Sequence, residues 1–273
     1  IAGGFESSST QPFRMWNPNH PDYQEGKCYT VAKFIPELQG EQVMLEGAEK
    51  TALTENVTKA EMDPWVLLSH KRAAQAAKEG ILSDIQLSIE GSRKDEGIRP
   101  SMSQRLLDRL PYILPGGKVI TAANACLMHD GAAFVVLCSE KYRKAHKLSP
   151  QAAFRFGTSI GSDPFMSPKT AVLAIRKLFK QTGLSIDEID SLEVNEAFAV
   201  IDVLLEREFP GIRDRLNPLG GALAYGHPYG ASGAIILLHL LKNLQVNKGR
   251  FGICGVAAAG GIGTSLLVER VKA

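Results

Sequence analysis

"GRFGICGVAAAGGIGTSLLVERVK", residues 249–272, reads as two apolar strands joined by a run of small residues. "GKVITAANACLMHDGAAFVVLCSEK", residues 117–141, follows the same plan. Each stretch begins with glycine and a basic residue, continues as a short apolar strand, and ends as a second apolar strand followed by charge. Two copies of one plan predict duplicated halves. The alternative, that two unrelated buried strand pairs look alike, stays open at this point.

The segment between these copies alternates between strand and helix patterns. "SPKTAVLAIRKLFKQTG", residues 167–183, has apolar residues at helical spacing and ends on a glycine. "IDSLEV", residues 189–194, is typical of a short strand, and a helix is expected from Glu196 to about Phe209. "SGAIILLHLLKNL", residues 232–244, is apolar on nearly all sides and is expected to be a core helix. This alternation predicts a layered α/β domain.

The first part of the chain follows a different pattern. Residues 5–57 have few periodic apolar positions, and Thr58 with Glu61 forms a capping-box signal for a helix that Gly80 ends. A short helix is expected near 104–110. "IAGG" at residues 1–4 reads as the tail of a buried strand, so we expect that the chain lacks its beginning. The central third therefore looks like an insertion in a scaffold.

Composition excludes several classes of protein. The chain has 273 residues, 44% of them hydrophobic and 22% charged, enough for one large or two ordinary domains. A net charge of +2 argues against a nucleic-acid binder. No apolar run approaches the ~20 residues that span a bilayer. The cysteines are scattered, which argues against disulfides and zinc and favours a cytoplasmic location; they are Cys28, Cys126, Cys138 and Cys254.

Two polar residues are candidates for chemistry. His227 lies among glycines in "LAYGHPYGASGA", residues 223–234, which is either a turn or a catalytic base that a substrate approaches closely. Asn195 follows the strand that ends at 194, where it either caps the next helix or binds a ligand at the strand's carboxyl end. Phe198 is placed to line a pocket there. From the residues alone, both interpretations of each position remain open.

Three other stretches of sequence resemble known functional motifs but lack residues that those motifs require. "AAAGGIGTSL", residues 257–266, lacks the third glycine and the following helix of a dinucleotide-binding loop. Residues 230–233 miss the G-x-S-x-G nucleophile elbow by one position. Cys126 and His129 lack the further ligands that a metal site needs. We therefore expect no metal and no nucleotide cofactor.

Several blocks together carry a family resemblance. The chain resembles thiolases of the acetyl-CoA acetyltransferase type over essentially its whole length. The first two of the following blocks are the most specific: "VNEAFA" (194–199), "NPLGGALAYGHPYGASGA" (217–234), "GGIG" (260–263), "AGGFES" (2–7), "TAANACLMHDGAA" (121–133) and "DEGIR" (95–99).

The resemblance implies an α-β-α-β-α layered fold with duplicated halves and an inserted loop domain that holds coenzyme A. Residues 1–9 and 116–145 would belong to an N-terminal half that is incomplete in this chain. Residues 10–115 would form the loop domain and 146–273 the C-terminal half. Dimers or tetramers are implied as well, either of this chain alone or with a chain that carries the missing segment.

The resemblance also assigns roles to residues. His227 would promote thiolate formation on an acylated cysteine, and Asn195 would hold a water that completes an oxyanion hole with that histidine. The coenzyme A thioester is the substrate, and no separate cofactor is implied. Substrate and coenzyme A contacts would come from Arg99, Ala122, Cys126, Phe198 and Met44.

Two departures from the family pattern affect the expected activity. The nucleophilic cysteine of such enzymes precedes the "AGGFES" block, so it would lie on a segment that this chain lacks. Counting back from Gly263 without gaps puts Ala257 at the acid/base cysteine position, and Cys254 would substitute only in a shifted register. Alanine cannot shuttle a proton.

Three functions are therefore weighed. The first is a thiolase-type acyl-CoA C-acyltransferase, an enzyme of thiolysis or of Claisen condensation, with doubtful activity of this chain alone. The second is a thiolase-like protein that binds or hydrolyses coenzyme A thioesters, or serves as a scaffold subunit, without condensing them. The third is an unrelated binding module in which His227 and Asn195 are structural.

Overall fold

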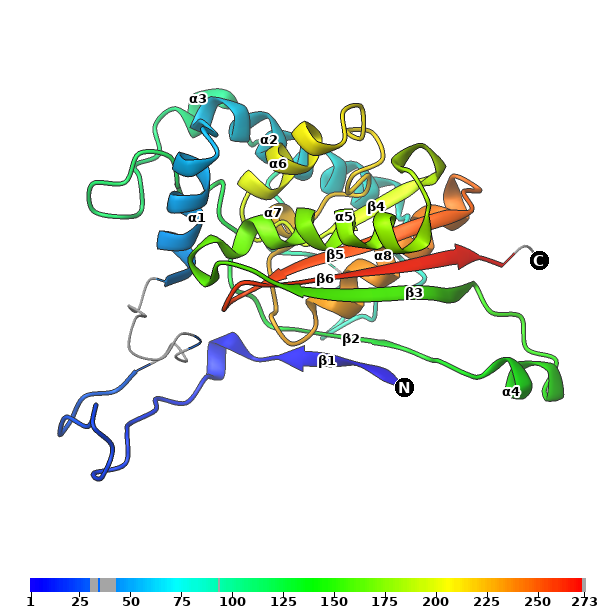
Figure 1. Ribbon diagram of the computed structural model, residues 1–273, viewed down its shortest axis with the longest axis horizontal. Helices are drawn as coiled ribbons and strands as arrows, with labels where there is room; N and C mark the ends of the chain where they lie inside the picture. Colours follow the sequence, from blue (N-terminus) through cyan, green and yellow to red (C-terminus); the bar gives the residue numbers. More distant parts are fainter. Residues whose placement is uncertain (30–33, 35–42, 93, 272–273) are drawn as a thin grey trace.

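The computed structural model describes residues 1–29, 34, 43–92 and 94–271. Within these residues the chain forms two sheets and a set of helices (Figure 1). In chain order the strands and longer helices are β1 (Ala2–Glu6), α1 (Val43–Thr54), α2 (Lys59–Glu79), α3 (Gln104–Leu107), β2 (Gly131–Val135), α4 (Glu140–Ala145), β3 (Ala152–Gly161), α5 (Thr170–Thr182), β4 (Ser191–Val194), α6 (Val200–Glu208), α7 (Ala222–Tyr225), α8 (Ser232–Val246), β5 (Phe251–Ala258) and β6 (Ile262–Arg270). Short 3-10 turns cover Ser8–Thr10, Pro164–Lys169 and Ile186–Glu188.

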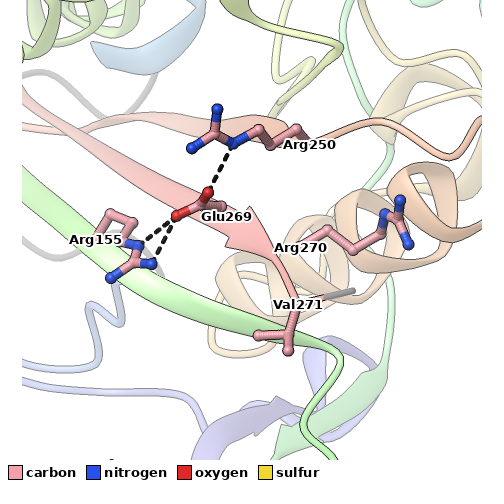
Figure 2. Close-up of a pocket in the computed structure, with 5 residues that line it drawn as sticks. All are labelled: Arg155, Arg250, Glu269, Arg270 and Val271. Carbon is pink, nitrogen blue, oxygen red and sulfur yellow. Dashed lines mark hydrogen bonds and ion pairs between the residues drawn. The ribbon is translucent and has the colours of Figure 1, made fainter. Parts of the chain in front are cut away.

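The larger sheet has the strand order β3-β6-β5-β4. β6 is antiparallel to both β3 and β5, and β4 lies parallel to β5 at the edge. The helix α5 packs on one face and α8 on the other (Figure 1). At the end of the sheet where β6 stops, Glu269 accepts from Arg155 and from Arg250, each at 2.7 Å (Figure 2).

The helix α8 is the layer between the two sheets. It contacts β4 and β5 on one side and β1 and β2 on the other. Its buried residues Ile236, Leu240 and Leu244 pack against Cys254 and Val268. The layers among the described residues therefore run α5, large sheet, α8, small sheet, which is a layered α/β fold as predicted.

The small sheet joins two segments that are far apart in sequence. β1 pairs antiparallel with β2, so that Gly4 faces Ala133. Gly4 packs against the carbonyl oxygen of Gly230 so closely that a Cβ would collide with it. The pairing brings residues on either side of the long insertion together. However, β1 is mostly exposed, with Phe5 at 74%, so it is not a buried strand among the described residues.

The two copies of the proposed repeat fold differently. Residues 249–272 form the expected strand pair, β5 and β6. In the first copy only the second strand, β2, forms. The backbone N–H groups of Lys118, Val119 and Ile120 donate to the carboxylate of Glu49 instead of to a neighbouring strand. A buried side chain thus satisfies donors that a sheet would otherwise pair, because buried N–H groups need an acceptor.

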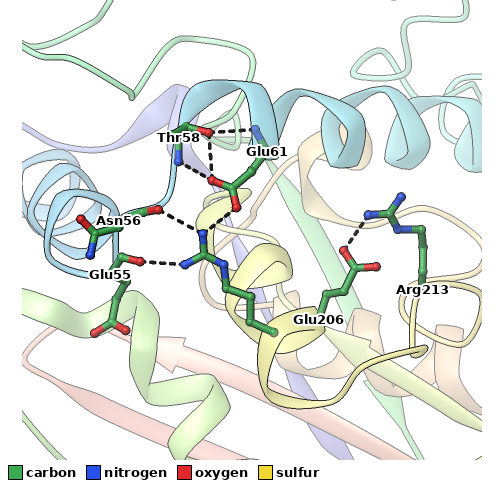
Figure 3. Close-up of polar contacts among 7 residues, drawn as sticks. Glu55, Asn56, Thr58, Glu61, Glu206 and Arg213 are labelled. Atoms are coloured by element: carbon green, nitrogen blue, oxygen red, sulfur yellow. Dashed lines mark hydrogen bonds and ion pairs between the residues drawn. The ribbon is translucent and has the colours of Figure 1, made fainter.

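The N-terminal end of α2 is tied to α6. Thr58 and Glu61 form the predicted capping box of α2, and Gly80 ends this helix in the left-handed conformation. Arg207 of α6 donates to the carbonyl oxygens of Glu55 and Asn56, at 2.7 and 3.0 Å, and to the carboxylate of Glu61 (Figure 3). The cap of α2 is therefore also one of its contacts with α6.

Among the described residues, no helix has the length and apolar character needed to cross a membrane.

Candidate active site

Asn195 is the first residue after β4, and its position is fixed by the sheet. Its backbone N–H donates to the carbonyl oxygen of Gly255 on β5 at 3.0 Å, and the residue is 1% exposed. The helix α6 begins only at Val200, with Ala199 as its N-cap. The sequence-based alternative that Asn195 caps this helix is therefore wrong, because a turn separates the two and leaves the amide available to another partner.

His227 is held by a turn between α7 and α8. Its backbone N–H donates to the carbonyl oxygen of Leu127 at 2.8 Å. Gly226 has φ +86, and a Cβ there would overlap the imidazole of His129. The space beside this glycine is thus filled by another side chain of the protein, not left open for a substrate as the glycine-rich sequence suggested. Gly230 is equally constrained, because a Cβ there would collide with the carbonyl of Phe5.

The side chains of Asn195 and His227 meet. Asn195 Nδ2 lies 3.1 Å from His227 Nε2, and the other ring nitrogen, Nδ1, lies 2.6 Å from the hydroxyl of Ser232. The ring of Tyr229 stands nearly perpendicular to the imidazole, with the centroids 4.7 Å apart. Burial lowers the pKa of His227 to about 4. The imidazole is therefore neutral at pH 7 and able to accept a proton.

The cysteines near this pair are thiols at neutral pH. Cys126 donates its backbone N–H to the carbonyl oxygen of Ala197 at 2.9 Å, next to the Asn195 turn, and burial raises its thiol pKa to about 12. Cys254 is 5% exposed, and burial raises its pKa well above the usual range. Neither environment stabilises a thiolate.

The register of β5 places Cys254 and Ala257 on opposite faces of the strand. β5 pairs with β6 continuously, with Ala257 opposite Gly263 and Cys254 opposite Leu266. Ala257 lies two residues beyond Gly255, on the same face of the strand and roughly 7 Å along it. Cys254 is on the opposite face, against α8. Because neighbouring residues of a strand face opposite sides, this register argues against Cys254 as the acid/base substitute.

The other predicted contact residues have partners of their own. Phe198 is 5% exposed and forms an isolated bridge with Ala125, so it belongs to the apolar core. Met44 is half-buried on α1 and packs against the same core. Arg99 and Ala122 are exposed, and the backbone N–H of Arg99 donates to His70 Nδ1 at 3.2 Å. Their predicted coenzyme A contacts stay predictions.

A buried network that the sequence did not reveal supports the Asn195 turn. Glu196 is not in a helix, contrary to expectation, and is 2% exposed. Its Oε2 accepts from the Ser69 hydroxyl at 2.7 Å and from the Leu223 N–H at 3.3 Å. The Gly221 N–H donates to the same hydroxyl at 3.0 Å. One carboxylate therefore joins α2, the Asn195 turn and the segment that leads to His227. Because Ser69 lies so far away in sequence, no local pattern predicts this contact.

A surface pocket of about 340 Å³ lies elsewhere, at the end of the sheet where β5 begins and β6 stops (Figure 2). Its lining residues are Arg155, Arg250, Glu269, Arg270 and Val271. Asn195 and Ala257 lie beyond or near the opposite ends of β4 and β5, so this pocket is separate from the candidate active site.

Comparisons with known proteins identify the family of the chain. The thiolase N-terminal domain matches residues 1–141 and the thiolase C-terminal domain matches residues 148–270. A beta-ketoadipyl-CoA thiolase of Escherichia coli is 32% identical over 289 residues, covering 99% of this chain and 72% of the relative. Acetyl-CoA acetyltransferase IA of Candida tropicalis is 32% identical over 292 residues, covering 100% of this chain and 71% of the relative.

A solved structure gives the same result. Human mitochondrial 3-ketoacyl-CoA thiolase in complex with CoA matches with a TM-score of 0.88 and 30% identity, over 99% of this chain and 70% of that chain. The fold is therefore thiolase-like, and the chain belongs to the thiolase family.

Proposed function

We propose that this protein is a thiolase-type acyl-CoA C-acyltransferase, which cleaves or forms a carbon–carbon bond in acyl-CoA thioesters. The observation that carries the proposal is the 3.1 Å contact between Asn195 Nδ2 and His227 Nε2 in a chain of the thiolase family. This contact supports a role in thioester chemistry because both groups approach one point from separate corners of the fold.

The pair supplies a base and an oxyanion site. The neutral imidazole takes the proton of an attacking thiol at Nε2. The resulting Nε2–H and the Asn195 amide N–H then both donate to the oxygen that becomes negative as the thiolate adds to the thioester carbonyl. The asparagine is held in place before reaction by the Gly255 carbonyl. A preorganised oxyanion donor of this kind typically contributes about 10²–10³ in rate.

The nucleophile remains an expectation from the family pattern. Burial raises the thiol pKa of Cys126 and of Cys254, which favours neither as the attacking thiolate. Cys28 and Cys138 are exposed and free. We propose that the acylated cysteine belongs to a segment outside these 273 residues.

A second candidate function rests on Ala257. Its place on β5, two residues beyond Gly255, holds no group that can move a proton to or from carbon. The protein would then bind coenzyme A thioesters and hydrolyse them, or act as a scaffold subunit, without condensing them. Ala257→Cys would introduce condensation under this reading, and an unchanged condensation rate would count against it.

The experiment measures consumption of acetoacetyl-CoA in the presence of CoA, with protein completed by a segment that carries the nucleophilic cysteine, as wild type and as His227→Ala and Asn195→Ala. We expect each substitution to abolish most of the turnover, because each removes one of the two groups at the carbonyl. His146→Ala is the matched control, since this exposed histidine contacts only Tyr142 among the aromatic residues described. Turnover unchanged by His227→Ala would leave the histidine with a structural role only, as in an unrelated binding module.

Partners and location are proposed on the same basis. We infer that the protein binds coenzyme A, is cytoplasmic and assembles as a homo-oligomer or with a chain that carries the nucleophile. The four free cysteines support a reducing compartment. The exposed apolar side chains on one face of the β1–β2 sheet support association; they are Ile1, Phe5, Phe134 and Val136.

A further inference from the structure

The hydroxyl of Ser232 has two partners, and they constrain its single proton. Ser232 is the first residue of α8 and is 4% exposed. Its Oγ lies 2.9 Å from the carbonyl oxygen of Pro228 and 2.6 Å from His227 Nδ1. The hydroxyl donates to this carbonyl oxygen, which can only accept and which also accepts from the backbone N–H groups of Ala231 and Ser232. The oxygen lone pair that remains faces Nδ1.

This arrangement determines which ring nitrogen of His227 carries the proton. A lone pair of Ser232 facing Nδ1 requires that Nδ1 carries hydrogen. At the other end of the ring, the NH₂ group of Asn195 faces Nε2 at 3.1 Å, and a donor there requires that Nε2 carries none. An amide can be turned over to present its oxygen, whereas the Pro228 carbonyl cannot, so the serine end is decisive. Both ends nevertheless require the same tautomer.

We infer that Ser232 is a positioning residue that holds neutral His227 in the Nδ1–H tautomer, with the Nε2 lone pair aimed at the Asn195 side. Because the hydroxyl donates to a fixed backbone carbonyl, its lone pair is oriented toward Nδ1 of the ring. The tautomer assignment stands on these contacts alone, and its effect on catalysis rests on the proposed function. During the proposed proton transfer the thiol S–H bond breaks and an Nε2–H bond forms, while Nδ1–H stays bonded to Ser232.

Loss of the hydroxyl leaves the ring free to take the other tautomer. In the Nε2–H form the base has no lone pair on the reacting side. For the same reason, other histidine-dependent enzymes lose rate when the imidazole adopts the wrong tautomer. One neutral hydrogen bond typically shifts such an equilibrium by about tenfold. We therefore expect Ser232→Ala to lower kcat about tenfold without changing KM, and Ser232→Thr, which keeps the hydroxyl, to restore it.

The test is ¹⁵N NMR of the histidine-labelled full chain at neutral pH, with the His227 signals assigned by their loss in His227→Gln. The expected spectrum has a protonated Nδ1 and an unprotonated Nε2 in wild type and in Ser232→Thr, and a mixture of tautomers in Ser232→Ala. Ser265→Ala is the matched control, because this buried serine donates to the carbonyl of Ala174 at 2.9 Å and has no contact with His227. An Nε2–H signal in the wild-type protein would overturn the inference.

The turnover measurement separates this inference from the proposed function. An Nδ1–H signal in wild-type protein that shows no acetoacetyl-CoA turnover when the nucleophile-bearing segment is present would contradict the proposed function and leave the tautomer in place. Ser232→Ala protein that keeps both the Nδ1–H signal and full kcat would overturn the positioning role. Thermal unfolding of each variant establishes that the comparison is between folded proteins.

Discussion

Gly226→Ala tests why glycine precedes the histidine. The backbone there has φ +86 and ψ 179, a conformation that costs a residue with a side chain about 1–3 kcal/mol. The new methyl group would also overlap the His129 imidazole, and overpacking of this kind costs about 1–3 kcal/mol more. We therefore expect a loss of about 2–6 kcal/mol in the free energy of unfolding, measured by urea denaturation. This is a large fraction of the about 5–15 kcal/mol of a typical protein.

A second variant separates the two contributions. In Gly226→Ala/His129→Ala the overlap is gone, so about 1–3 kcal/mol should return while the backbone cost remains. Nδ1 of His129 is buried without a hydrogen-bond partner, so its removal breaks no bond of that nitrogen. Gly233→Ala is the matched control, because that glycine lies in α8 with open space around it, and alanine there should add about 0.5–1 kcal/mol. A Gly226→Ala protein as stable as wild type would refute this reasoning.

Two further substitutions test the buried carboxylates. Asp202 is fully buried with both oxygens unpartnered, and burial together with nearby Glu196 raises its pKa well above the usual value, opposed by Arg72. A raised folded-state pKa means that stability is full below the unfolded-state pKa and falls as pH rises toward the folded one. In wild type the free energy of unfolding should fall above pH about 4, and Asp202→Asn should make this fall smaller by up to about 1.4 kcal/mol per pH unit. If urea denaturation gives the same dependence of unfolding free energy on pH in both proteins, this prediction is wrong. Ser69→Ala should cost about 1–3 kcal/mol, because it removes a donor to Glu196 and leaves the Gly221 N–H without its acceptor; unchanged urea stability would show that this network is dispensable.

The sequence was most informative where the signal is local. The capping box of Thr58 and Glu61, the left-handed Gly80 and Gly183 at helix ends, and the apolar helix α8 all follow from patterns within a few residues. These predictions were confirmed because the groups that interact are neighbours in the chain. The family resemblance added the expected thiolase fold and the roles expected of Asn195 and His227.

The sequence was least informative where a residue has a distant partner. Asn195 has the local signal of a helix cap, but its amide faces His227 instead. Residues 119–121 have a strand pattern, but their backbone donates in part to Glu49. Gly226 looked like an opening for a substrate until His129 proved to fill the space beside it. In each case the deciding atom lies many residues away, where propensity and periodicity carry no information.

The proposed function requires that an imidazole and an amide contact one thioester carbonyl. The most direct measurement is an experimental structure of the full chain with a non-hydrolysable acetyl-CoA analogue. We predict that the carbonyl oxygen of the analogue lies about 2.7–3.2 Å from both Asn195 Nδ2 and His227 Nε2. An analogue bound with its carbonyl away from both atoms, for example in the arginine-lined pocket at the other end of the sheet, would contradict the central claim.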